Sequence, residues 1–75
     1  MEKPTDEKRR ERALGNDLRR AILTSLGDHE MRPRELRVAL GGLSLSRLNY
    51  HLVVLEDAHL IRRDRGRYGR VGGEG

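Results

Sequence analysis

The sequence predicts a mainly α fold in which three short helices precede a two-stranded β-hairpin. Apolar residues recur at helical spacing in three separate stretches, and glycines separate these stretches from one another. The C-terminal part contains two short runs joined by an Arg-Gly pair that suits a tight hairpin turn. The 75 residues, of which 35% are hydrophobic, allow one domain with a small core of Leu, Ile, Val and Ala.

Two helices are expected in the first half of the chain. The first covers residues 17–26, where leucine and isoleucine recur every four residues. Asn16 is expected to cap its N-terminus and Gly27 to end it. The second opens at Pro33, because the fixed φ angle of proline suits a first helical turn, and it stops at Gly41.

A third helix and a hairpin are expected after the glycine turn. The helix covers about residues 44–58, with Ser44 as its N-cap. The leucines expected on its buried stripe are Leu45, Leu48, Leu52 and Leu55. Two short strands over residues 60–64 and 67–71 are joined by the Arg-Gly pair, whose glycine permits the positive φ of a tight turn.

The two ends of the chain are expected to lie outside the folded domain, which is placed at residues 13–71. Residues 1–12 mix acidic and basic side chains and have no hydrophobic residue after Met1, which predicts a charged flexible tail or a fraying helical turn. The glycine-rich residues 72–75 are expected to form a flexible end. Neither end is expected to add to the core.

Several functional classes find no support in the residues. The absence of cysteine excludes disulfides and thiolate metal sites, and the three histidines share no ligand spacing, so no metal and no cofactor is expected. No nucleophile elbow, phosphate-binding loop or paired carboxylates are present, and the chain is not expected to be an enzyme. The apolar runs are too short to span a membrane or to direct secretion, so a cytoplasmic location is expected.

The segment of residues 44–61, SLSRLNYHLVVLEDAHLI, resembles the recognition helix of ArsR-type winged helix-turn-helix transcription regulators. In that family a helix ending in His-Leu, a further leucine and an Ala-Gly-Leu-Ile/Val close lead into the wing, and the resemblance extends over about residues 16–71. It implies a three-helix winged helix-turn-helix domain that binds double-stranded DNA; whether two copies pair as a homodimer stays open. His59 departs from the pattern, since the family usually has Gly at this left-handed position.

The outward face of the third helix carries the residues expected to read bases. If the leucines face the core, the opposite face presents Ser46, Arg47, Tyr50, Val54 and Asp57. Arg47 is the first choice for a base contact, because Arg bonds guanine bidentately in the major groove. Asn49 lies at the border of this face and has either a DNA contact or a local capping bond as its role.

The hairpin is the most basic part of the chain and is expected to act as a wing. Residues 62–70 contain five arginines and one aspartate, in a chain with a net charge of +4. Such a wing suits the phosphate backbone or the minor groove. The residues expected at the DNA interface are Arg32, Arg34, Ser44, Ser46, Arg47, Asn49, Tyr50, Arg62, Arg63, Arg65 and Arg67.

Less specific interpretations account for the same residues. The polar face of the third helix is also what a solvated amphipathic helix presents, and a basic edge strand prevents aggregation. Arg32 and Arg34 at the start of the second helix either contact a phosphate or point into solvent. As a different class, the domain is a protein-docking module whose wing meets an acidic partner, and a third interpretation is duplex or RNA binding without base preference. His51 is expected to be half-buried against the second helix and to bond a backbone carbonyl.

Overall fold

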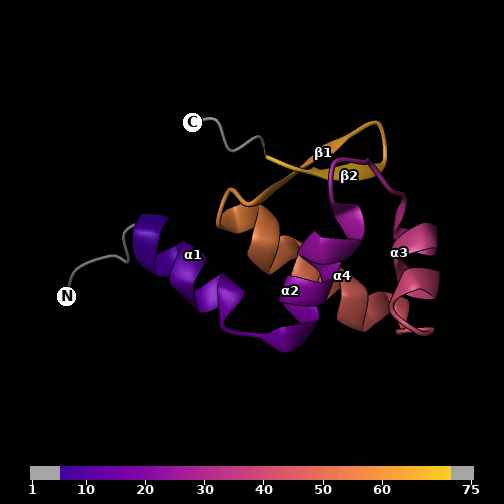
Figure 1. Ribbon diagram of the computed structural model, residues 1–75, viewed down its shortest axis with the longest axis horizontal. Coiled ribbons are helices and arrows are strands. Elements are labelled where there is room, and N and C mark those ends of the chain that lie inside the picture. The colour runs from indigo at the N-terminus through magenta and orange to yellow at the C-terminus, as the bar shows by residue number, and fades with distance from the viewer. Residues whose placement is uncertain (1–5, 72–75) are drawn as a thin grey trace.

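The computed structural model describes residues 6–71 and confirms the mainly α class with a C-terminal hairpin. Within this range the elements are α1 (Asp6–Leu14), α2 (Asp17–Leu26), α3 (Pro33–Ala39), α4 (Leu45–Asp57), β1 (Ile61–Asp64) and β2 (Arg67–Arg70). Helices α1 and α3 lie at opposite ends of the molecule, with α2 and α4 between them and the hairpin along one side (Figure 1). β1 packs against α4, and β2 against α2.

The predicted boundaries of α2 are confirmed at both ends. The side-chain oxygen of Asn16 accepts hydrogen bonds from the backbone N–H groups of Leu18 and Arg19 at 2.9 and 3.1 Å, so the first turn is capped. Gly27 follows the last turn at φ 52°, and its N–H donates to the carbonyl of Leu23. Capping residues at both ends explain why a sequence pattern located this helix so closely.

A tight turn joins α3 to α4. Gly41 and Gly42 adopt φ angles of 83° and 90°, a region that glycine enters without steric cost. Nε of Arg37 donates to the carbonyl of Leu43 at 2.8 Å and ties the end of the turn back to α3. Ser44 then caps α4 as predicted, with its hydroxyl accepting from the N–H of Arg47 at 3.3 Å.

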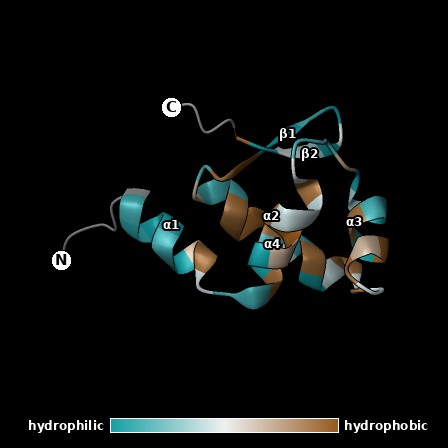
Figure 2. Cartoon of the chain, in the orientation of Figure 1, coloured by the Kyte–Doolittle hydropathy of each residue, from teal (hydrophilic) through white to brown (hydrophobic). Residues whose placement is uncertain are grey.

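Helix α1 corrects the prediction for part of the N-terminal segment. Residues 6–12, expected within a flexible charged tail, are helical, and the next residue, Ala13, is fully buried in the core. Figure 2 shows that α1 is hydrophilic over most of its length, which is why the apolar pattern did not indicate a helix. Residues 1–5 and 72–75 lie outside the described residues, and the limits 13–71 for the domain remain a prediction.

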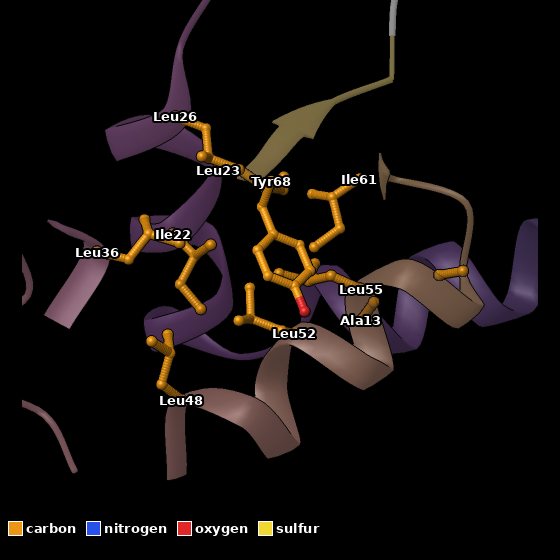
Figure 3. Close-up of a cluster of buried hydrophobic side chains, with 11 residues drawn as sticks. Ala13, Ile22, Leu23, Leu26, Leu36, Leu48, Leu52, Leu55, Ile61 and Tyr68 are labelled. Atoms are coloured by element: carbon orange, nitrogen blue, oxygen red, sulfur yellow. The ribbon is translucent and has the colours of Figure 1, made fainter. Parts of the chain in front are cut away.

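The core lies between α2, α3, α4 and the hairpin (Figure 3). Its buried hydrophobic residues are Ala13, Ile22, Leu23, Leu26, Leu36, Leu48, Leu52, Leu55, Ala58, Ile61 and Tyr68. The expectation of a purely aliphatic core is wrong, because the ring of Tyr68 points from β2 into the leucine cluster. Two residues of α4 are also corrected: Leu45 is 48% exposed, although it was expected on the buried stripe, and Val54, expected to face outward, is partly buried.

The hairpin has a two-residue turn and a backbone link to the rest of the domain. Arg65 and Gly66 have φ angles of 55° and 79°, the pattern of a type I′ turn, which matches the natural twist of paired strands. Met31, in the loop between α2 and α3, exchanges two backbone hydrogen bonds with Tyr68, at 2.9 and 2.8 Å. This bridge attaches the hairpin to the chain segment that leads into α3.

Candidate nucleic-acid interface

A depression on the surface lies between the first turns of α3 and α4 and the hairpin. We call it the arginine groove; it is lined by Arg32, Pro33, Arg34, Arg37, Leu45, Asn49, Arg63, Gly66 and Tyr68. Four of the residues predicted at the interface therefore come together from three elements: Arg32, Arg34, Asn49 and Arg63. The start of α4 and the hairpin lie on one side of the molecule, as a continuous DNA-binding surface requires.

The groove is cationic, and most of its charge is uncompensated. Within residues 6–71, no acidic side chain forms an ion pair with Arg34 or Arg63, and both are exposed. Glu35 lies nearby, but its carboxylate accepts a hydrogen bond from the backbone N–H of Arg32 at 2.8 Å and so caps the start of α3. A negative group of the chain itself thus already offsets the helix dipole at this point.

The two faces of the hairpin distribute its arginines differently. Arg63 is paired across the strands with Tyr68, and since such pairs share one face of a hairpin, Arg63 lies on the groove side. Arg62 lies opposite Gly69 on the other face, with its guanidinium 3.9 Å from the carboxylate of Glu30. A Cβ at Gly69 would come within 3.2 Å of Cγ of Glu30, so this glycine provides the space for Glu30.

The tip of the hairpin forms a second, mixed-charge depression. It is lined by Glu30, Arg32, Asp64, Arg65 and Arg67. Arg67 is paired across the strands with Asp64, whereas Arg65 occupies the turn itself and is exposed. Arg65 is therefore the cation at the tip of the hairpin, and Arg32 lines both this depression and the arginine groove.

The exposed face of α4 differs from the predicted one by a small rotation. Ser46, Asn49 and Tyr50 are exposed as expected, and Tyr50 is 63% exposed. Val53, rather than Val54, continues this face. Arg47 is exposed but lies on the flank of α4 away from the groove lining, where its charge acts on His51.

A buried contact between Arg19 of α2 and His51 of α4 was not predicted from the sequence. Arg19 is only 8% exposed; its Nε donates to the carbonyl of Ala13 at 2.8 Å, and its guanidinium also contacts the carbonyl of Arg12. A third contact joins it to Nδ1 of His51 at 3.2 Å. We call this set of contacts the Arg19 clamp, because it holds the end of α1 against α2 and α4.

The partner of His51 corrects the sequence expectation. His51 was expected to bond a backbone carbonyl beside the second predicted helix, but it lies against Arg19 of α2. A guanidinium has donors only, so Nδ1 must accept and the imidazole is neutral with its proton on Nε2. Burial lowers the pKa of His51, and the charges of Arg19 and then Arg47 lower it further. The signal was present in the sequence, because Arg19 shares the helical spacing of Ile22, Leu23 and Leu26.

Two further features of residues 6–71 concern metal ions and membranes. No three His, Cys, Asp or Glu side chains in this range come together in an arrangement suited to a metal ion. No helix there is long and apolar enough to cross a bilayer.

Helix α3, the glycine turn, α4 and the hairpin beside them define a winged helix-turn-helix fold. Among solved structures, HlyU from Vibrio cholerae N16961 is 30% identical, with a TM-score of 0.78 over 92% of this chain and 78% of HlyU. NolR from Sinorhizobium fredii is 32% identical, with a TM-score of 0.71 over 97% of this chain and 84% of NolR.

No family model matches the chain, and no curated protein matches it significantly. HlyU and NolR are both winged helix-turn-helix transcription regulators and not enzymes. At this identity and coverage, the chain belongs to the winged helix-turn-helix transcription regulators.

Proposed function

We propose that the chain is an ArsR-type regulator that binds double-stranded DNA, with the first turns of α4 in the major groove and the hairpin as a wing on the backbone or in the minor groove. The observation that carries this proposal is the arginine groove, in which the start of α3 and the hairpin present cations beside the first turns of α4. A concentrated positive surface whose cations lack acidic partners suits a polyanion.

The exposed residues of α4 support a role in reading bases. A major groove about 12 Å wide admits one helix, and the first turns of α4 present Ser46, Asn49 and Tyr50 to solvent. Arg47 is assigned a guanine contact from the second flank of the helix. The hydroxyl of Ser44 is engaged as the N-cap, so its role at the interface is to donate its proton to a phosphate while it holds the helix end.

The remaining arginines are assigned mainly to phosphates. Arg32 and Arg34 lie at the start of α3 on one side of α4, while Arg63 and Arg65 lie on the hairpin. Contacts of this kind set the register of the protein on the duplex and supply affinity that does not depend on sequence. Arg62 and Arg67 contribute less in this proposal, because Glu30 and Asp64 lie beside them.

The ArsR assignment rests on the segment of residues 44–61. It is supported by His59, which adopts φ 59° at the position where that family usually has Gly, so the left-handed end of the recognition helix is kept with a different residue. Pairing of two copies belongs to the proposal as well, and the symmetry of the DNA site tests it.

Selection of duplexes from a randomised pool, followed by titration at two salt concentrations, tests the proposal. Arg47→Ala is expected to cost about 1–3 kcal/mol on the selected site and to relax one base position. Arg65→Ala is expected to weaken binding to all sequences and to reduce the salt slope by about one unit. Inverted half-sites in the selected sequences would indicate a homodimer.

This experiment, together with retention on a DNA column and a pull-down of protein partners, separates DNA binding from the competing interpretations. Equal affinity for every sequence would indicate shape-selective binding and would contradict the proposed base reading. Failure to be retained on DNA, together with capture of an acidic protein through the hairpin, would replace the proposal by a protein-docking role.

A further inference from the structure

Leu45 is an exposed apolar side chain in the middle of a cationic surface. It is the first residue of α4, and 48% of its surface is accessible, whereas the other leucines of this helix are buried. It lines the arginine groove together with arginines from α3 and the hairpin. The core is complete without it, so stability alone does not explain a leucine here.

Asn49 lies one helical turn further along the same flank. Residues four apart on a helix are neighbours, with a rise of about 6 Å between them, close to two base-pair steps of about 3.4 Å. Both side chains line the arginine groove, and Arg47 does not. The flank of α4 that faces the hairpin thus presents an apolar group and, one helical turn further along, an amide.

These two groups match the major-groove edge of A·T pairs. The C5 methyl of thymine is the apolar group on that edge, and aliphatic side chains contact it. An Asn amide bonds the N6 and N7 atoms of adenine bidentately. Leu has no donor for a phosphate, and the Asn amide has an acceptor as well as donors, a combination that a base edge satisfies and a phosphate, which only accepts, does not.

We propose that Leu45 recognises the methyl group of a thymine and Asn49 an adenine about two base-pair steps away, so that the hairpin-facing flank of α4 selects A·T pairs. This inference rests on the proposed DNA-binding function. In this proposal the two flanks of α4 recognise different base pairs. The flank beside the hairpin recognises A·T pairs, and Arg47 on the other flank contacts a guanine.

The test removes single methyl groups from the DNA. In a duplex chosen by selection, each thymine is replaced in turn by deoxyuridine, and binding of the full chain is titrated. One replacement is expected to weaken wild-type binding about threefold to fivefold, the value of one buried methyl group. Leu45→Ala is expected to bind the thymine duplex more weakly and to give equal affinities for the thymine and deoxyuridine duplexes at that position.

Matched controls separate this effect from a general loss of binding. Val38→Ala removes another exposed aliphatic group, 76% exposed on α3 and outside the groove lining, and is expected to retain the full response to deoxyuridine. Leu45→Met keeps an apolar side chain and is expected to retain most of the response. For Asn49, replacing the adenine about two base-pair steps from this thymine by 7-deazaadenine is expected to weaken the wild type about tenfold and to leave Asn49→Ala unaffected.

Three results would overturn the inference. Sequence-selective binding with no response to any deoxyuridine would exclude a methyl contact while leaving the proposed function intact. A response of Leu45→Ala equal to that of the wild type would assign the methyl contact to another residue. Absence of any sequence preference would reject the inference together with the base reading on which it rests.

Discussion

Arg19 and the arginines of the groove are the same residue type in opposite surroundings. Arg19 is buried, and its guanidinium meets two backbone carbonyls and the acceptor nitrogen of His51. Arg34 and Arg63 are exposed, and no acidic side chain within residues 6–71 pairs with them. Arg19 thus holds elements together, while Arg34 and Arg63 leave their charge available to a group that binds from outside.

The number of acceptors that the fold supplies makes the difference. A buried guanidinium is tolerated only where its donors are satisfied, so the carbonyls at the end of α1 and the neutral imidazole are required partners of Arg19. Composition counts all these arginines as positive charge and cannot separate the two groups. A count of basic residues in the sequence therefore overestimates the positive charge on the surface, because Arg19 is buried and its donors are used inside the fold.

The largest effect is expected from Arg19→Met. This change leaves two carbonyls and a histidine without their buried partner, and it is expected to lower the free energy of unfolding by about 2–4 kcal/mol. Arg65→Ala, at an exposed turn, is expected to change stability by no more than about 0.5 kcal/mol. Urea unfolding followed by circular dichroism measures both variants, and equal stabilities would remove the distinction between the two groups of arginines.

A smaller effect on stability is expected from a change in pH, through His51 of the Arg19 clamp. The folded state lowers the pKa of His51 below its usual value near 6.5, so the unfolded chain binds a proton more readily. Stability from this group is therefore complete above pH 6.5 and is lost as the pH falls through the lowered value in the folded state. At low pH, both ring nitrogens become donors, and the contact with Arg19 turns repulsive.

His51→Gln sharpens the pH prediction. The amide oxygen of glutamine can accept from Arg19 but does not titrate, so the variant is expected to lose less stability than the wild type between pH 7 and pH 5. The two exposed histidines, His29 and His59, are present in both proteins and serve as an internal control. Parallel pH profiles for the two proteins would show that the clamp does not titrate in this range.

The smallest effect on stability is expected at His59, which lies between the end of α4 and the first strand of the hairpin. His59 has φ 59°, a conformation that costs a residue with a Cβ more than glycine. His59→Gly is expected to raise the free energy of unfolding by about 0.5–1 kcal/mol and to leave DNA affinity unchanged. Thermal unfolding measures this gain in stability. A loss of stability would show instead that the side chain of His59 makes a stabilising contact.

Elements with local signals were predictable, and those with distant partners were not. Helix α2 was located because Asn16 and Gly27 mark its ends next to a clear apolar pattern. Helix α1 lacks such a pattern, and its end is held by Arg19 from the next helix. Tyr68 belongs to the core because β2 packs against α2, a contact between segments far apart in the chain.

The sequence predicted many of the residues of the candidate site, but not how the fold groups them in space. Exposure of Ser46, Asn49 and Tyr50 follows from the helical period, and the basic hairpin is evident from composition. The grouping of Arg34 with Arg63 required the position of α3 relative to the strands. Leu45 was assigned to the core because the period of α4 extends to its first turn, where no neighbouring element covers it.

The backbone link between Met31 and Tyr68 has a mechanical consequence for the proposed DNA contacts. Met31 immediately precedes Arg32, and Tyr68 immediately follows Arg67, so the two backbone hydrogen bonds between Met31 and Tyr68 set the spacing between the main-chain positions of these two arginines. The domain therefore holds the main chain of these two proposed contact residues at a fixed interval, and only the length of the arginine side chains adapts to the backbone of the proposed duplex.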